Sequence, residues 1–186
     1  GKVLYWGTSE WSAQQLTEAF GVAALHHLTP PAMEQPQYSL FHRATVEKDY
    51  LPLFERFGLG TTTWSPLASG ILTGKYNEGV PEGSRLSLPS LQWLRARLDT
   101  GAGRLQLDKV RRLQALGDEA GLPVHHLALL WVLENPHVSS VILGASRIGQ
   151  LVDNLDALGN REKMTPELLA RIEEIVDNKP EPAEQF

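Results

Sequence analysis

Four short runs of apolar and β-branched residues are separated by longer segments in which apolar residues recur at helical spacing. The runs predict buried strands at residues 3–7, 32–35, 61–64 and 139–144. Prolines on both sides confine the second strand to a short piece. Strands and helices alternate in the order βαβαβααβαα, which favours parallel strands joined by helical crossovers.

Helix ends are marked by capping residues and by glycine. Ser12 and Ser146 are expected N-caps, and Thr165-Pro166-Glu167 combines a threonine cap, a proline at the first helical position and an acid in the first turn. Gly58 and Gly121 are expected to end helices. The predicted helices cover residues 13–20, 45–57, 91–98, 105–116, 125–133, 147–157 and 165–176. The rest of residues 77–103 is expected to be irregular.

The composition narrows the classes of function. A chain of 186 residues can bury a core and predicts one domain at 1–176, followed by a polar tail at 177–186. A formal net charge of −5 argues against nucleic acid as a partner.

The absence of cysteine excludes disulfides, thiolate catalysis and thiolate zinc sites. Because no apolar run is long enough to span a bilayer and no signal peptide is visible, we expect a cytoplasmic protein without direct membrane insertion.

Residues 60–76, GTTTWSPLASGILTGKY, carry the clearest chemical signal. Trp64 ends a strand, small residues follow it in a loop, and Lys75 adds one positive charge. An aromatic face, exposed backbone and a lysine suit a ligand that has both a ring and phosphates. Taken alone, Trp64 is more often a core residue and Lys75 an ordinary solvated charge. Three strand ends lead into loops of small residues, and the carboxyl ends of parallel strands are where βα folds bind ligands.

Several motifs occur together and in a consistent order. They are YWGTS at 5–9, Glu34-Gln35 with Tyr38, residues 63–76, and residues 141–154 with LGAS at 143–146. In these segments the chain resembles the second half of the aldo-keto reductase barrel, and within that family the potassium-channel β-subunit-like branch. The resemblance implies an α/β fold, half of a (β/α)8 TIM barrel, with four parallel strands and helices packed on the outer face.

The resemblance also implies an NADP(H) site, which we assign position by position. Ser9 and Gln35 would hydrogen-bond the nicotinamide carboxamide, and Trp64 would stack on the nicotinamide ring. The residues expected along the pyrophosphate, including two charged contacts from the covering loop, are Ser65, Pro66, Leu67, Ser69, Gly70, Lys75 and Arg85. The residues expected around the adenosine and its 2′-phosphate are Gly144, Ser146, Arg147, Gln150, Asp153 and Asn154.

Plainer interpretations stay open for several of these residues. Gln35 could only satisfy backbone groups beside the prolines, and Gly144-Ala145-Ser146 is also an ordinary strand-to-helix turn with a cap. Asp153-Asn154 could belong to a solvated helix face. The pairs His26-His27 and His125-His126 have no metal-ligand spacing, so no metal site is expected.

Some features depart from the family pattern. Glu10 places a negative charge beside the expected cofactor, and Gly83 stands where the family often has an aromatic clamp. The family's catalytic Tyr, Asp, Lys and His lie in the first half of the barrel, and neither Tyr5 nor Tyr38 takes the place of that tyrosine. We therefore expect a truncated chain with no catalytic residue of its own.

The leading functional expectation is an oxidoreductase that takes part in the NADPH-dependent reduction of a small-molecule aldehyde or ketone. The alternatives are a non-catalytic NADP-binding or regulatory subunit similar to channel β-subunits, and a fragment of a longer enzyme. A half-barrel has two open sheet edges and a bare inner face. We therefore expect it to pair with a complementing half-barrel or, as a homo-oligomer, with a second copy of itself.

Overall fold

The chain folds as two compact units. The computed structural model describes residues 2–181, so the last five residues of the predicted tail, 182–186, lie outside the described residues. The first unit, called the sheet unit, contains the described residues of segments 1–66, 132–143 and 179–186. The second, called the helical unit, contains residues 67–131 and 144–178.

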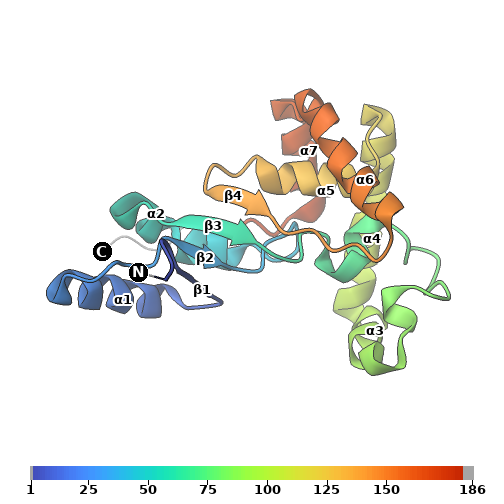
Figure 1. Cartoon of the computed structure of the whole chain (residues 1–186). Helices are drawn as coiled ribbons and strands as arrows, with labels where there is room; N and C mark the ends of the chain where they lie inside the picture. Colours follow the sequence, from blue (N-terminus) through green and yellow to red (C-terminus); the bar gives the residue numbers. More distant parts are fainter. Residues whose placement is uncertain (1, 182–186) are drawn as a thin grey trace. The chain divides into compact units, whose positions relative to one another are not determined.

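The sheet unit holds a four-stranded parallel sheet whose spatial order follows the chain (Figure 1). Its strands are β1 (Gly7–Ser9), β2 (Met33–Gln35), β3 (Gly60–Thr63) and β4 (Val138–Val141). Each strand runs parallel to its neighbour. The predicted α/β class with four parallel strands is therefore confirmed, and it is the arrangement expected of part of a (β/α)8 barrel.

The first strand begins later than the apolar pattern predicted. Residues 3–6 lie outside β1, and Val3, Leu4 and Tyr5 are 70%, 87% and 78% exposed. Gly7 pairs with Met33, so an extended ladder would place residues 4 and 5 opposite Pro30 and Pro31. Proline has no backbone N–H to give to a ladder, which explains why the strand does not extend back over this run.

Helices α1 (Ala13–His26) and α2 (Leu51–Phe57) belong to the sheet unit. The Ser12 cap of α1 is confirmed as a capping box with Gln15. The predicted helix over 45–57 is divided at Tyr50 into the π-helical turn η1 (Thr45–Asp49) and α2, because the ring of Pro52 disfavours a continuous helix through this point. Stacked rings of Phe20 and Phe57, 4.1 Å apart, join α1 to α2.

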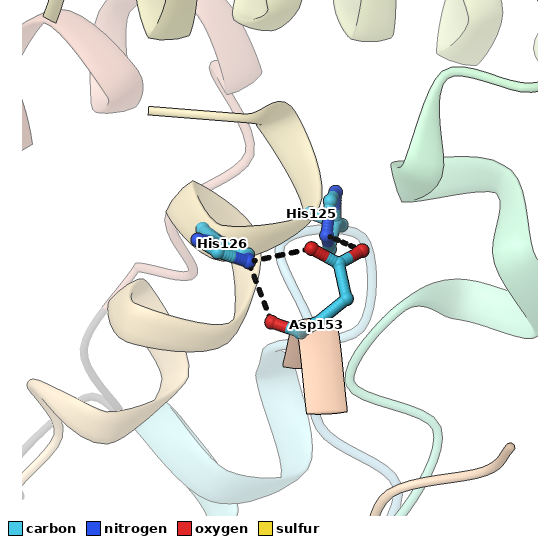
Figure 2. A group of neighbouring side chains, drawn as sticks. All are labelled: His125, His126 and Asp153. Carbon is cyan, nitrogen blue, oxygen red and sulfur yellow. Dashed lines mark hydrogen bonds and ion pairs between the residues drawn. The ribbon is translucent and has the colours of Figure 1, made fainter. Parts of the chain in front are cut away.

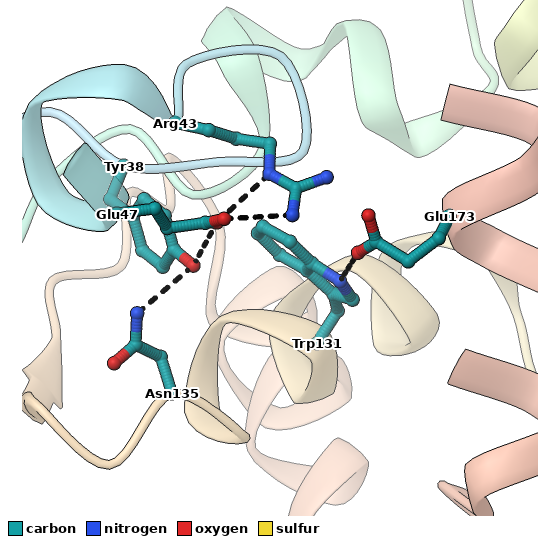
Figure 3. A network of polar contacts seen from close by, with 6 residues as sticks. All are labelled: Tyr38, Arg43, Glu47, Trp131, Asn135 and Glu173. Atoms are coloured by element: carbon teal, nitrogen blue, oxygen red, sulfur yellow. Dashed lines mark hydrogen bonds and ion pairs between the residues drawn. The ribbon is translucent and has the colours of Figure 1, made fainter. Parts of the chain in front are cut away.

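A buried polar network fixes the segment that follows β2 (Figure 3). Arg43 donates from Nε to Oε1 of Glu47 at 2.9 Å and from Nη2 to Oε2 at 2.8 Å. The Tyr38 hydroxyl donates to the same carboxylate at 2.7 Å and accepts from Nδ2 of Asn135 at 3.2 Å. Desolvation, with the nearby charge of Glu47, raises the pKa of Tyr38 far above its usual range. Its phenol therefore stays protonated and structural.

The helical unit contains the remaining helices. They are η2 (Ala68–Thr73), η3 (Arg85–Ser87), η4 (Pro89–Leu91), α3 (Gln92–Leu98), α4 (Gly101–Ala120), α5 (Val124–Leu133, whose last two residues belong to the sheet unit), α6 (Ile148–Asp156), η5 (Ala157–Lys163) and α7 (Pro166–Val176). Nε1 of Trp131 on α5 donates to Glu173 on α7 at 3.3 Å (Figure 3). Among residues 2–181, no helix has the length and hydropathy required to cross a membrane.

The two predicted caps in the helical unit have different outcomes. Thr165 caps α7 as expected, and its hydroxyl accepts from the amide of Leu168 at 3.3 Å. The prediction that Ser146 caps the next-to-last helix is wrong, because α6 has Arg147 as its N-cap without a side-chain hydrogen bond. The carbonyl oxygen of the Gln150 side chain accepts from both the amide and the hydroxyl of Ser146, so this hydroxyl acts as a donor rather than as a cap.

Candidate functional site

Three of the residues expected at the nicotinamide lie at the carboxyl ends of neighbouring strands. Ser9 and Gln35 are the last residues of β1 and β2 and are paired in register, and the Ser9 hydroxyl donates to the Gln35 carbonyl at 3.0 Å. Trp64 directly follows β3 and forms a parallel bridge with Gln37. The sheet thus brings Ser9, Gln35 and Trp64 to one end of the sheet, where ligands of parallel βα folds bind.

Glu10 holds the indole of Trp64. Its Oε1 accepts from Nε1 of Trp64 at 2.9 Å and from the amide of Gln37 at 2.6 Å. Sequence reasoning missed this contact, because it treated Glu10 only as an unfavourable charge and the two residues are 54 positions apart. The side chain therefore orients the aromatic ring as well as placing a negative charge beside it.

The loops after β1 and β3 contain strained backbone. Glu10, Ser65, Ala68 and Ser69 have φ values of 60°, 55°, 47° and 60°, in the left-handed region that residues with a β-carbon rarely adopt. Such residues cost on the order of 1–3 kcal/mol each and cluster at ligand-binding loops. Of these, Glu10 and Ser65 belong to the sheet unit and lie just after the ends of β1 and β3, which supports the assignment of a binding site to this end of the sheet.

Glu34 is a fully buried carboxyl group beside the same strand ends. It accepts from the hydroxyl of Thr8 and from the amide of Trp11, the latter at 3.1 Å. Burial raises the pKa of Glu34, these hydrogen bonds oppose the shift, and the charge of Glu10 adds slightly to it. Glu34 therefore favours its protonated form more strongly than an exposed glutamate does.

In the helical unit, the loop after β3 lies against Lys75. Gly70 has a φ of 92°, and a β-carbon at this position would lie 3.0 Å from Nζ of Lys75. The same ammonium group lies 5.1 Å from the centre of the Tyr76 ring. The structure thus brings Gly70 and Lys75 together, whereas Arg85 is an exposed residue at the start of η3, and their binding of a phosphate stays a prediction.

The residues expected around adenosine lie at and within α6. Gly144, Ser146 and Arg147 are exposed ahead of the helix, and Ser146 is joined to Gln150 as described above. Asn154 is buried. An exposed helix N-terminus is favourable for a phosphate group. The role of these residues in binding the cofactor stays a prediction.

Asp153 contacts two histidines that sequence reasoning had set aside (Figure 2). Its Oδ2 lies 2.8 Å from Nε2 of His125, and its Oδ1 lies 3.4 Å from Nε2 of His126. Nε2 of His126 also lies 2.7 Å from the Asp153 carbonyl oxygen. Burial lowers the pKa of His125, and the charge of Asp153 opposes this shift. Asp153, which is expected near the adenosine, therefore contacts two histidines of α5. No local sequence pattern predicts this contact.

The sequence was also compared with known proteins. The model of the Aldo/keto reductase family matches residues 1–177. An inferred voltage-gated potassium channel subunit beta from Schizosaccharomyces pombe is 48% identical over 180 residues, which are 97% of this chain and 52% of that protein. Inferred subunits of the same kind from Oryza sativa subsp. japonica and Arabidopsis thaliana are 47% and 46% identical over 100% of this chain and 56% of their own length.

The chain therefore spans about half the length of the curated relatives that it matches. The match to the family model extends over all four strands and all seven α-helices described above. Together with the parallel sheet and its strand-end residues, this match shows that the chain belongs to the aldo/keto reductase family.

Proposed function

We propose that the chain provides the NADP(H)-binding half of an aldo/keto reductase barrel and takes part in the NADPH-dependent reduction of an aldehyde or ketone. The observation that carries the proposal is the placement of Ser9, Gln35 and Trp64 at the carboxyl ends of three neighbouring parallel strands. Two hydrogen-bonding side chains and an aromatic face are what a nicotinamide carboxamide and its ring require. The family membership supports the same assignment.

Within each unit taken by itself, the residues present fit a part of this cofactor. Trp64 is only partly buried and is oriented by Glu10, so one of its faces could receive a ring. Gly70 leaves room for Nζ of Lys75 above the loop backbone, where a positive charge favours a pyrophosphate. When bound, NADPH supplies a hydride to the carbonyl carbon. The contribution of this chain is to bind and orient the cofactor.

No side chain of this chain is assigned as the proton donor. Carbonyl reduction requires a proton donor close to the carbonyl oxygen. The Tyr38 hydroxyl donates to Glu47, and the Tyr50 hydroxyl donates to the carbonyl of Trp11. Burial raises the pKa of both phenols far above their usual range, which makes them poor acids. The proton is therefore expected to come from outside these two groups.

A second candidate function is an NADP-binding regulatory subunit without turnover. The specific support is the identity of 46–48% to three proteins that are named as inferred channel subunits beta. Both functions share the cofactor site, so binding alone does not separate them. Consumption of NADPH in the presence of aromatic aldehydes does separate them, and it is the second measurement to make.

The first experiment is a titration of the chain with NADPH, followed by tryptophan quenching and energy transfer to the nicotinamide, with NADH for comparison. We expect saturable binding that prefers NADPH, and most of the energy transfer should disappear in Trp64→Phe. Trp93→Phe is the matched control, because Trp93 is 59% exposed on α3 and has no expected cofactor role. Equal losses of transfer in the two variants, or no binding at all, would count against the proposal.

A further inference from the structure

His125, His126 and Asp153 converge inside the helical unit (Figure 2). Two consecutive histidines in the first turn of α5 direct their Nε2 atoms toward one carboxylate from α6. In the part of the chain that the structure describes, these three residues form a histidine and carboxylate cluster whose ligand atoms all lie within 4.8 Å of one another.

We propose that His125, His126 and Asp153 form a binding site for a divalent transition-metal ion of the Zn²⁺ class. Two imidazole nitrogens and one carboxylate oxygen are donors that suit Zn²⁺ and Co²⁺. Three protein ligands leave a fourth position for water or for an oxygen atom of a small ligand. This proposal revises the expectation of no metal site, which rested on sequence spacing alone.

The distances fit an ion after a small adjustment of side chains. Metal–ligand bonds of about 2.0–2.2 Å place neighbouring tetrahedral ligand atoms about 3.4 Å apart. The separation of Nε2 of His126 from Oδ1 of Asp153 is 3.4 Å, which matches this value, and that of Nε2 of His125 from Oδ2 is 2.8 Å, which is shorter. Asp153 is the ligand best able to move, because 56% of its side chain is exposed, and Nε2 of the buried His126 would exchange its hydrogen bond with the Asp153 carbonyl oxygen for a bond to the ion.

Hydrogen bonding alone does not account for the contact at His125. Its Nε2 is buried and lies 2.8 Å from Oδ2 of Asp153, but the contact does not meet the angular requirement of a well-directed hydrogen bond. The two groups thus have the separation of a hydrogen bond without its direction. Most buried side-chain nitrogens in folded proteins have a partner. An ion between the nitrogen and the carboxylate would supply one.

One residue of the cluster borders a hollow, and another is exposed to solvent. His125 lines a hollow in the helical unit that also includes Thr73, Gln114 and Asp118. The hollow could admit the fourth ligand, and Asp118 adds a second carboxylate to its wall. Of the three ligands, His126 is buried, His125 borders the hollow and the Asp153 side chain is 56% exposed.

The chain contains a matched control for this proposal. His26 and His27 are also consecutive histidines, but they are exposed at the end of α1 and are not part of a cluster with a carboxylate in residues 2–181. A weak, nonspecific affinity of a histidine pair for metal ions would be shared by both pairs. A site built by the fold would belong to His125 and His126 alone.

The test uses the chain without a histidine tag, stripped by a chelator and titrated with Co²⁺ and then Zn²⁺. We expect one equivalent of Co²⁺ to give the visible absorption of a four-coordinate ion, and Zn²⁺ to displace it. Asp153→Asn, a substitution of equal size at an exposed residue, should weaken Zn²⁺ binding at least about tenfold. The double variant His26→Ala/His27→Ala should bind like the parent chain.

A second measurement identifies the ligand atoms directly. Long-range ¹H–¹⁵N spectra of the imidazoles should show Zn²⁺-dependent shifts at Nε2 of His125 and His126, with His26 and His27 unchanged. The proposal is overturned if no saturable binding occurs at one equivalent. It is equally overturned if Asp153→Asn binds Zn²⁺ like the parent while the His26→Ala/His27→Ala variant loses binding.

Discussion

Glu10 has two opposing effects on the expected nicotinamide site. Its carboxylate orients the indole of Trp64, and its negative charge disfavours a phosphorylated ligand. Glu10→Gln keeps an acceptor for the indole and removes the charge. Because exposed charges contribute about 0.2–1 kcal/mol, we expect this variant to bind NADPH up to about fivefold more tightly in the fluorescence titration.

Glu10→Ala separates the two effects, since it removes the acceptor as well as the charge. The indole of Trp64 should become more mobile, and the steady-state anisotropy of its fluorescence should fall relative to Glu10→Gln. We expect the hydrogen bond of Glu10 to favour NADPH binding and its charge to oppose it. Weaker NADPH binding in Glu10→Gln than in the parent chain would contradict this expectation.

Glu34 should make the stability of the fold depend on pH. Its pKa in the folded chain is raised above the ordinary value of 4.5, so the folded state binds the proton more tightly than the unfolded state. The free energy of unfolding should therefore fall as the pH rises from about 4.5 through the raised pKa. Glu34→Gln should flatten this dependence, because it keeps hydrogen-bonding groups for Thr8 and Trp11 without a titratable proton.

Urea unfolding of the parent and Glu34→Gln between pH 4.5 and 7.5 measures this effect. Glu18→Gln on α1 is the control, because Glu18 is exposed and its replacement should leave the pH dependence as it is in the parent. A parent chain whose stability rises steadily with pH over this range, with the same slope in Glu34→Gln, would rule out the assigned role.

At the scale of elements, the Arg43–Glu47 pair should be important for η1 and the segment after β2. The Arg43 side chain is 3% exposed and that of Glu47 is 14% exposed. Arg43→Met leaves the carboxylate of Glu47 buried without its cation, which we expect to cost about 3–5 kcal/mol of unfolding free energy. Arg171→Met, which breaks the exposed ion pair with Glu119, should cost less than about 1 kcal/mol.

Denaturant unfolding of the two arginine variants under identical conditions provides the comparison. If their midpoints shift by the same small amount, the buried pair is not a major contributor to stability. A larger shift for Arg43→Met alone supports the network drawn in Figure 3.

Alanine substitutions of Thr165, before α7, and of Ser146, before α6, should change the stability of the chain by different amounts. Thr165→Ala removes a side-chain cap of α7 and should destabilise the chain by about 1 kcal/mol. Ser146→Ala should have a smaller effect, because the Ser146 hydroxyl lies outside α6 and does not cap its amides. Thermal or urea unfolding of both variants checks this order, and a larger loss for Ser146→Ala would reverse it.

The sequence predicted the elements better than it predicted their side-chain partners. The helix starts at Ser12 and Thr165 and the strand near residues 32–35 were predictable, because caps and prolines act locally. The start of β1 was not, since it depends on which residues face it across the sheet. The contacts of Glu10 with Trp64 and of Asp153 with His125 were also hidden, because only the fold brings together residues so far apart in sequence.

At the scale of the whole molecule, the open sheet predicts association. β1 and β4 are the two edge strands, and Val3, Leu4 and Tyr5 ahead of β1 are exposed apolar residues. We expect the chain to self-associate or to bind a complementing half-barrel, and size-exclusion chromatography with light scattering over a dilution series measures the first. A single monomeric species at all concentrations, stable for days, would contradict self-association.

The insertion of residues 67–131 between β3 and β4 sets an order of events for folding. Met33 pairs with Gly60, whereas Thr61 pairs with Val138, so the last pairing closes a much longer loop. Loop-closure entropy makes the longer closure about 1 kcal/mol more costly, and it also waits on the synthesis of the intervening helices. β1 to β3 can therefore assemble early on the ribosome, while the edge of β3 stays without its neighbour until β4 has emerged. During that interval the nascent chain presents an unpaired strand edge, the kind of edge on which another chain can pair and start aggregation.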